Sequence, residues 1–455
     1  MIMAEKVTMW WSWSLSHLFL TVFLFNFSSF MVAPAITDVS MAALCPGQDE
    51  CSLAIYLTGI QQAITGMGNI VMMPLIGHLS DHHGRKLLLT FPMILAIFPS
   101  VILAYSMDRE FFYAYLVIKT LTSMVCEGTV LCLALAYVAD NVAEQRRASA
   151  FGILSGISSC SFVLGSLLTR FLPSHASVFQ VSAAMGMISL LYMRILLPES
   201  NMEAMMIDVS SKETATNECL LEKGVVNNRR PLRTTPSLHD SISLLKSSWT
   251  FSQAAIVAFF STFGELGLVS AILYYLRAEF HFDKDEFAYL LIINGVAGII
   301  SLMIIMPMLA KVLNEEKLLA IGLAFNCIYI SLYAVAWASW VVYLSSVLQI
   351  FAVFIGPSLR SIVSKQAGPS EQGKAQGCIT GICSLAGIIS PLVFSPLTAL
   401  FLSDHAPFRF PGFSLMCAAF IVMIAFIQSI MIKAPTPLPL PVADNKIDEY
   451  DSAEL

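Results

Sequence analysis

Charge is what this sequence has least of. Only 12% of its 455 residues are Asp, Glu, Lys or Arg, about half of the roughly 25% that a soluble domain carries. So few charges could not cover the surface of a soluble protein, whereas 57% of the residues are hydrophobic and the mean hydropathy is +0.74. The composition excludes an ordinary soluble protein and predicts an all-α membrane protein with many spanning helices.

Other features are missing too. The 25 Lys and Arg do not exceed the 31 Asp and Glu, so no basic surface for nucleic acid is expected. The patterns HExxH, GxSxG and GxxxxGK[ST] are absent, and His82 and His83 stand in a basic turn without the spacing of metal ligands. We therefore expect no enzyme, no metal and no cofactor. Glu5 and Lys6 precede an apolar run without a small-residue cleavage site, so the first span is expected to be a retained anchor.

Apolar runs between charged residues and Pro or Gly breaks predict twelve spanning helices. Their predicted limits are 15–36, 53–79, 87–106, 111–139, 149–171, 176–197, 249–275, 286–310, 318–338, 340–364, 376–402 and 411–432. Six spans lie on each side of a long polar stretch, which lacks apolar periodicity. The predicted domains are an N-terminal six-helix bundle (1–197), a cytoplasmic linker (198–248), a C-terminal six-helix bundle (249–432) and a disordered acidic tail (433–455).

Two loops suggest that the halves are related. Residues 136–152 and 361–377 each join a fourth span of a half to its fifth, and Arg147–Gly152 aligns with Gln372–Gly377. The similarity is weak, and chance alignment of two short loops is the alternative. Its position in each half favours an internal duplication, which predicts two pseudo-symmetric six-helix bundles.

The loop cations set the expected orientation. One side of the predicted topology collects Lys6, Arg85, Lys86, Arg146, Arg147, Lys311, Lys317, Arg360, Lys365, Lys374, Lys433 and Lys446, and the other collects Arg109, Arg170, Arg277, Lys284 and Arg409. Twelve cations against five place both termini of a multi-pass protein in the cytoplasm. The plasma membrane and vacuolar or other endomembranes both stay open.

Two of the ten cysteines, Cys45 and Cys51, share the first external loop. They are predicted to form a local disulfide if that side is oxidising, and a pair of free thiols is the alternative. Two sulfurs without a nearby histidine pair do not complete a tetrahedral zinc site.

The loop between spans two and three reads GHLSDHHGRK, from Gly77 to Lys86. Gly77 and Gly84 are expected to allow tight turning. Asp81 offers an acceptor that can cap a helix N-terminus or bind an arginine. Arg85 and Lys86 are expected to hold the loop in the cytoplasm.

This loop closely resembles the signature of the major facilitator superfamily. Residues 136–152 resemble the loop between helices four and five of that family, and 197–200 resemble its exit from helix six. Residues 376–397 and 53–62 look like plant members of its tetracycline-resistance-like and hippocampus-abundant-transcript-like branch. The resemblance implies the major facilitator fold and a secondary active transporter.

The sequence also departs from that pattern. Residues 309–318, where a second copy of the loop signature is expected, have lost both glycines. Span five lacks the Gly-Pro pair of antiporters. In span one, counting back from Pro34 leads to Phe25 and Asn26, where bacterial drug antiporters tend to carry an acid. These departures place export in the bacterial manner in doubt.

Three ionisable residues fall inside predicted spans: Lys119 and Glu127 in span four and Glu265 in span seven. Such groups are costly in a bilayer and therefore need a partner or a purpose. Glu127 and Glu265 are candidates for proton coupling, because a carboxyl group in a low-dielectric site can exchange a proton near pH 7. Lys119 is a candidate for substrate contact. The alternative for Glu265 is a structural pair with Lys119 or an amide network.

The resemblance implies that spans one, four, seven and ten line a central cavity. Asn26 in span one and Gln349 in span ten are therefore candidates for substrate binding. The commoner use of such amides is hydrogen bonding between helices.

Charged residues at the inner ends of spans four and five form a further candidate group. Asp140, together with Arg146 or Arg147, is predicted to join Asp81 in a network that latches the two halves when the cavity opens outward. Simple cytoplasmic anchoring is the alternative. Arg170, Arg194 and Arg360 lie near span ends, where long cationic side chains reach the interface, and we assign them no function.

The expected function is alternating-access transport of a small organic solute, coupled to protons. The expected partners are the solute, the proton and the lipid bilayer, and the protein is expected to be a monomer. The alternative is a non-transporting receptor or scaffold on the same fold, which the altered second loop and the missing antiporter proline favour.

Overall fold

The computed structural model describes residues 2–44, 52–200, 245, 248–282, 284–368, 370–403 and 406–432, and nearly all of them are helical. Twelve helical segments in these ranges are long and apolar enough to cross a membrane. They are Trp13–Ile36, Gly59–His83, Arg85–Tyr105, Arg109–Asn141, Glu144–Phe171, His175–Leu196, Trp249–Phe280, Tyr289–Leu309, Glu315–Ala334, Ser339–Gln366, Gln372–Leu402 and Phe413–Ile430. The predicted all-α, twelve-span fold is confirmed.

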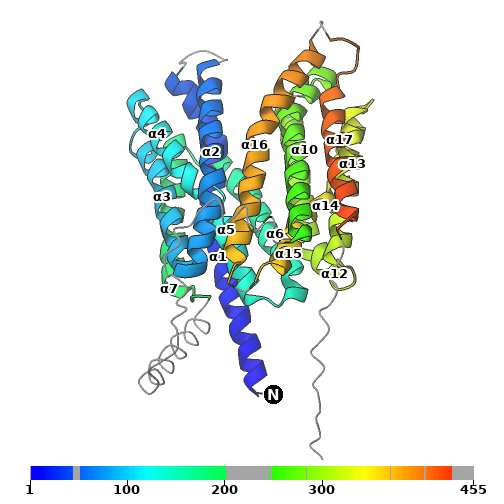
Figure 1. The fold of residues 1–455 in the computed structure, drawn as a ribbon. Coiled ribbons are helices and arrows are strands. Elements are labelled where there is room, and N and C mark those ends of the chain that lie inside the picture. Colours follow the sequence, from blue (N-terminus) through cyan, green and yellow to red (C-terminus); the bar gives the residue numbers. More distant parts are fainter. Residues whose placement is uncertain are drawn as a thin grey trace, which may run out of the picture.

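The helices form two groups, which stand side by side in Figure 1. The first half contains α1 (Ile2–Leu44), α2 (Ser52–His83), α3 (Arg85–Tyr105), α4 (Arg109–Cys126), α5 (Thr129–Asn141), α6 (Arg147–Leu168) and α7 (His175–Leu196), with the short turns η1 (Glu144–Arg146) and η2 (Thr169–Phe171). The second half contains α10 (Trp249–Phe280), α11 (Lys284–Ile300), the π-helical turn η3 (Ser301–Ile305), α12 (Met306–Leu309), α13 (Glu315–Ala334), α14 (Ser339–Ala352), α15 (Ile355–Gln366), α16 (Gln372–Leu402) and α17 (Phe413–Ile430). The halves meet where α2 lies along α16.

Several predictions fall outside the described residues. They include the linker between 201 and 244, the tail from 433 to 455, and the pair Cys45 and Cys51. The domain boundaries and the disulfide therefore stay predictions.

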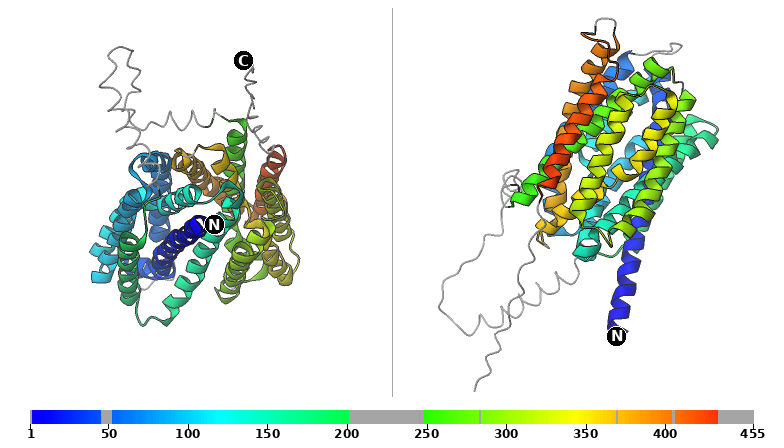
Figure 2. Two further views of the ribbon diagram at one scale, coloured as in Figure 1. Left: turned by 90° about the horizontal axis from the view of Figure 1, so that it is seen from below. Right: turned by 90° about the vertical axis from the view of Figure 1, so that its right-hand side faces the viewer.

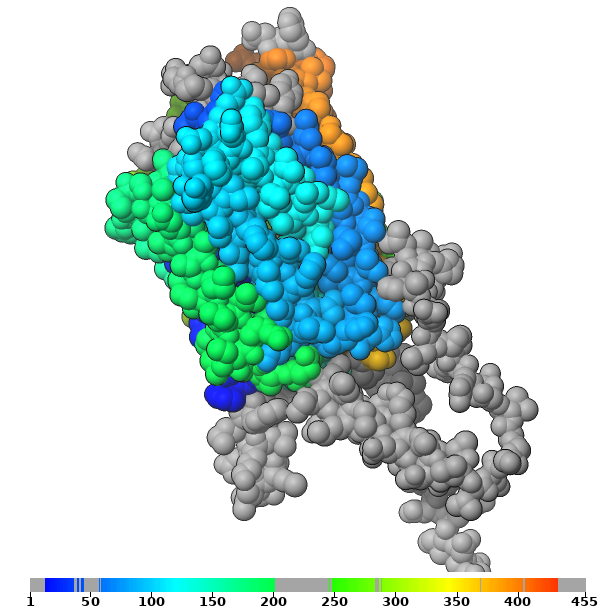
Figure 3. Space-filling model, turned by 90° about the vertical axis from the view of Figure 1, so that its left-hand side faces the viewer, coloured from blue at the N-terminus to red at the C-terminus, as the bar shows by residue number. Residues whose placement is uncertain are grey.

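Each half has its own apolar interior, and the outside of the molecule is apolar as well. Phe151 and Met193 are fully buried in the first half, as are Phe251 and Phe394 in the second. Figure 3 shows the face over α2, α3, α4 and α7. Many large hydrophobic side chains of these helices are exposed, among them Phe91 of α3 at 59%. Such a surface suits lipid, because hydrocarbon chains replace the water that would otherwise meet it.

Span four is interrupted near its middle, although its sequence predicts one continuous helix. The residue at the break, Gly128, has a φ of 81°, a conformation that favours glycine because it has no Cβ. With its side-chain amide flipped, the orientation that pairs both of its polar atoms, Asn69 donates to the backbone oxygens of Met124 and Glu127 at 3.2 and 3.3 Å. The Thr129 hydroxyl donates to a further carbonyl, that of Val125. These contacts satisfy carbonyls that the break would otherwise leave unpaired inside the membrane.

Span ten is interrupted at the corresponding point. Pro357 has no N–H, and its ring crowds the carbonyl of Val353, four residues earlier, so α14 ends at Ala352. The loop alignment of Arg147 with Gln372 is an offset of 225 residues, and the same offset places Gly128 on Val353. The two halves thus share an interrupted fourth span, as pseudo-symmetric bundles should.

Candidate functional site

Three charged side chains meet at the ends of α2, α3 and α5, on the predicted cytoplasmic side. Arg85 Nη2 lies 2.5 Å from Asp81 Oδ1, and Arg85 Nε lies 2.9 Å from Asp140 Oδ2. The Arg85 side chain is only 1% exposed and both carboxylates are 3% exposed. Arg85 also donates to the Ser80 hydroxyl. Because a buried charge is tolerated only when it is paired, these residues depend on one another.

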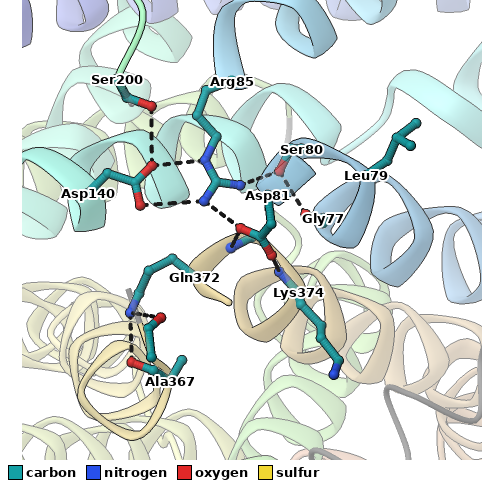
Figure 4. A network of polar contacts seen from close by, with 12 residues as sticks. Gly77, Leu79, Ser80, Asp81, Arg85, Asp140, Ser200, Ala367, Gln372 and Lys374 are labelled. Carbon is teal, nitrogen blue, oxygen red and sulfur yellow. Dashed lines mark hydrogen bonds and ion pairs between the residues drawn. The ribbon is translucent and has the colours of Figure 1, made fainter. Parts of the chain in front are cut away.

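Asp81 also connects the two halves of the molecule. Its Oδ1 accepts from the backbone N–H of Gly373, and its Oδ2 from that of Lys374, both at 2.9 Å (Figure 4). These N–H groups belong to the first turn of α16, which has no intrahelical partners for them. The carboxylate therefore caps a helix N-terminus, whose dipole favours negative charge, and binds an arginine at the same time.

The glycines of the loop have different uses. Gly84 lies between α2 and α3 with a φ of 88°, as expected for a tight turn. Gly77 does not form a turn, because it lies inside α2, so the expectation of a tight turn at Gly77 is wrong. A Cβ at Gly77 would meet the carbonyl oxygen of Gly373 and would lie 3.3 Å from the Cα of Gly377. Gly77 thus allows the backbones of α2 and α16 to touch.

Sequence reasoning missed two residues that complete this cluster. Glu199 accepts from the backbone N–H groups of Arg85 at 2.6 Å and Lys86 at 3.0 Å, so it caps α3. Ser200 donates to Asp140 at 3.2 Å. The sequence signal that could have identified them is Glu199 itself, an acid directly after Pro198 at the end of span six.

Neither Arg146 nor Arg147 forms an ion pair with Asp81 or Asp140 among the described residues, although Arg147 lies within electrostatic range of Asp140. Arg146 is exposed. Arg147 Nη1 donates to the backbone oxygen and hydroxyl of Ser364 in the second half, at 3.2 and 3.0 Å, and its Nε donates to Val142 O at 3.1 Å. Arg147 therefore joins the halves at a second place.

We call these two contacts the first and second seams. The first seam is the contact of α2 with α16 around Asp81 and Gly77. The second seam is the contact of α6 with η3, α12 and α15. A Cβ at Gly152 would lie 2.7 Å from Met306 Sδ, and one at Gly156 would lie 2.6 Å from Met303 Cγ, so methionine side chains fill this seam.

The candidate coupling residue Glu265 is exposed although it lies within a spanning helix. α10 packs through Gly264 on Val422 and through Gly267 on Phe394, which leaves Glu265 on a different face. Tyr329 lies within electrostatic range of its carboxylate. No ion pair joins Glu265 to Lys119 within the described ranges, and Lys119 instead lies in electrostatic range of Cys126.

The other candidates are dispersed. Glu127 is exposed at the break between α4 and α5, and Gln349 is half-buried one turn before the interruption of span ten. Asn26 Nδ2 donates to Ser158 at 3.0 Å, a bond between α1 and α6. Among described residues, no hydrogen bond or ion pair connects any two of Asn26, Lys119, Glu127, Glu265 and Gln349. The geometry favours a helix-joining use for Asn26.

Arg360 behaves differently from the snorkelling side chain that its position suggested. Its Nη1 donates to the backbone oxygen of Gln376 at 2.9 Å, the side-chain oxygen of Gln376 at 3.3 Å and the hydroxyl of Thr380 at 3.0 Å. Arg360 therefore turns toward α16 inside the protein and not toward the interface.

A cavity of about 640 Å³ lies between the halves at the opposite, predicted external side. It is lined by Ala33, Pro34, Ala35, Phe162, Val163, Ser166, Leu167, Thr169, Arg170, Leu172, Pro173, Ser174, His175, Val178, Leu291 and Ile292. Its size is within the range of pockets that take small organic molecules.

Comparison with known sequences places these features in a family context. The profile described as Major Facilitator Superfamily matches residues 18–391 and 254–449. The human Hippocampus abundant transcript 1 protein is 23% identical over 353 residues, which cover 76% of this chain and 66% of that protein. The chain thus spans just under two thirds of that relative's length. The class H tetracycline resistance protein of Pasteurella multocida is 25% identical over 350 residues, covering 76% of this chain and 80% of the relative.

Two solved structures share the fold. The crystal structure of the human organic anion transporter MFSD10 aligns with a TM-score of 0.71 at 17% identity, covering 92% of this chain and 99% of that one. The transporter FucP in its outward conformation aligns with a TM-score of 0.61 at 14% identity, covering 91% and 98%.

Proposed function

Because the chain belongs to the major facilitator superfamily, whose members are membrane transporters and in general not enzymes, we propose that it is a secondary active transporter. It moves a small organic solute across the membrane by alternating access. The observation that carries the proposal is the bridge from Asp81 to the first turn of α16. Alternating access needs a contact that closes one side of the protein and that can break.

The first seam is the cytoplasmic gate in this proposal. Gly77 allows the helices to touch, Asp81 bridges them, and Arg85 and Asp140 hold the Asp81 carboxylate in place. Gly84, Lys86 and Glu199, which caps α3, shape the turn that carries Arg85. Hydrogen bonds to a charged group contribute about 1.5–3 kcal/mol each. The gate can still open, because water replaces those bonds once the helices separate.

Glu265 is the proposed coupling residue, because it is an accessible carboxyl group within a spanning helix without an ion-pair partner in the described ranges. Glu127 is the second candidate, since it lies exposed at a helix break. Lys119 and Gln349 are the proposed substrate contacts, whereas Asn26, the third candidate, joins α1 to α6 through Ser158. The structural neighbour MFSD10 is an organic anion transporter, which supports an organic solute here.

Transport by purified protein in proteoliposomes tests the proposal. Solutes that raise the thermal stability of the protein at pH 5.5 or 7.5 are offered with an imposed pH gradient. We expect accumulation that follows the gradient. Glu265→Gln is expected to abolish gradient-driven accumulation and to keep solute exchange, whereas the matched change Glu315→Gln, outside the proposed coupling site, should alter neither. Stabilising solutes that never cross would favour the receptor or scaffold alternative.

We also propose that both termini face the cytoplasm and that the transporter acts as a monomer in the plasma membrane or an endomembrane. The excess of loop cations on the terminal side supports this orientation. Protease accessibility of an N-terminal tag in sealed cells tests it, and cleavage from outside would contradict it.

A further inference from the structure

Arg360 carries a charge that the fold does not neutralise. It lies in span ten, six residues before the end of α15. An arginine side chain stays charged in a protein, and a charge at this depth is expensive without a partner. No carboxylate forms an ion pair with Arg360 within the ranges that the structure covers, and its partners are the neutral Gln376 and Thr380.

The guanidinium is held in one orientation with one edge unused. Nη1 makes all three of its hydrogen bonds, and Gln376 Nε2 returns a bond to the Arg360 backbone oxygen at 3.2 Å. Nε and Nη2 have no partner among the described residues. These two atoms form the edge that binds a carboxylate with two parallel bonds. Arg85 shows that use, since its Nε and Nη2 grip Asp140 at 2.9 and 3.4 Å.

Arg360 lies where the buried seam ends. Residues 372–379 of α16 are all buried, and Thr380 is the first half-buried residue after them. On α15, Arg360 is half-buried between Leu359 and Ser361, which are both buried. The offset between the halves places it on Leu135, a buried apolar residue that is 3% exposed. The charge is therefore not part of the duplicated architecture.

We propose that Arg360, supported by Gln376 and Thr380, binds the carboxylate group of an anionic organic solute. The proposal rests on the transport function and names the chemical class of its substrate. The Nε–Nη2 edge takes the two carboxylate oxygens. The Thr380 hydroxyl accepts from Nη1 and donates to the backbone oxygen of Gln376, so it holds the guanidinium in place. The solute supplies the negative charge that this part of the protein lacks.

Matched acids and amides test the proposal on the purified full-length protein. Thermal unfolding is followed with benzoate, hexanoate and succinate, and with benzamide, hexanamide and succinamide. We expect acids to stabilise the protein and the corresponding amides to do so much less. Arg360→Gln should weaken acid binding roughly 10- to 100-fold. Arg360→Lys, which keeps the charge and loses the two-atom edge, should give an intermediate loss.

Arg194→Gln is the matched control, because it removes an exposed arginine of span six that lies, like Arg360, near the predicted cytoplasmic side. It should leave acid binding unchanged. The proposal is overturned if no acid stabilises the wild type, if amides bind as well as acids, or if Arg360→Gln keeps the preference. Uptake in proteoliposomes separates the two proposals. Flux of neutral solutes only would refute the anion site and leave transport intact, whereas acid binding without flux would refute transport and leave the site intact.

Discussion

The two seams join the same two halves through different kinds of contact. In the first seam, backbone meets backbone at Gly77 and Gly373, and the buried carboxylate of Asp81 spans the contact. In the second seam, glycines of α6 face the flexible side chains of Met303 and Met306. The left view of Figure 2, from the predicted cytoplasmic side, shows the two helix groups side by side.

The difference indicates a division of labour. A buried charge in a glycine contact has one good geometry, so the first seam is either closed or open. Methionine has three rotatable bonds and fills irregular space, so the second seam can adapt as the halves rotate. The ion pair near the second seam does not cross it, because Glu315 and Lys365, 2.7 Å apart, belong to the same half. We therefore place the latch in the first seam alone.

The largest effect is expected from Asp81→Asn. The change leaves Arg85 with one buried carboxylate and removes the charge from the start of α16, and breaking a buried ion pair costs about 3–5 kcal/mol. The gate should open more often, so N-ethylmaleimide should modify Cys132 and Cys378 at least tenfold faster, since these thiols are 1% and 4% exposed when it is closed. Mass spectrometry of the labelled protein measures this.

Asp108→Asn is the control for that experiment, because it neutralises an exposed aspartate at the other end of the protein. It should leave both labelling rates unchanged. Equal rates in Asp81→Asn and the wild type would refute the latch.

A pair of alanine substitutions compares the seams directly. In Gly77→Ala, the new methyl group meets backbone atoms of α16, which cannot move aside without separating the helices, so we expect a cost of about 1–3 kcal/mol. In Gly152→Ala, the methyl group meets the flexible Met306 side chain at 2.7 Å and a backbone atom, Leu302 O, only at 3.3 Å, so the cost should be smaller. Thermal unfolding and the same thiol labelling measure both variants. A larger effect for Gly152→Ala would reverse the assignment of the seams.

Arg147→Gln should have a moderate effect. It removes two bonds to Ser364 across the second seam, both to neutral groups, at a cost of about 1.5–3 kcal/mol at most, reduced because Arg147 is only half-buried. Labelling of Cys378 should rise by less than in Asp81→Asn. The neighbouring variant Arg146→Gln, at an exposed residue, should behave like the wild type, and a change there would show that net charge matters more than the contact.

Glu315→Gln should have the smallest effect on the gate. Glu315 is buried and Lys365 is 21% exposed, and their ion pair lies within one half, so its loss should lower the thermal stability but leave thiol labelling unchanged. Labelling that matches that of Asp81→Asn would mean that the second half contains a latch of its own.

The sequence predicted the twelve spans because apolar run length is a local property. It also placed Asp81 and Asp140 in one network, although the arginine that pairs with both is Arg85 and not Arg146 or Arg147. Both proposed uses of Asp81, capping a helix and binding an arginine, occur together.

What escaped prediction depends on tertiary contacts. The partner of Asp81 lies in the other half of the chain, and no local pattern indicates which helix N-terminus it meets. The role of Gly77 follows from the approach of α16, and the direction of Arg360 follows from Gln376 and Thr380. The break at Gly128 was not predicted, because a single glycine in an apolar run does not by itself end a helix. The matching break before Pro357 in the second half shows that both fourth spans are interrupted.

The most direct test of the central claim measures the distance across the first seam. Spin labels at the exposed positions His83 and Ser370, in a cysteine-free protein in nanodiscs, report the separation of α2 from the start of α16 by pulsed electron resonance. We expect one short distance in the wild type and an added long-distance population in Asp81→Asn. The same short distance in both proteins would contradict the claim that Asp81 closes the gate.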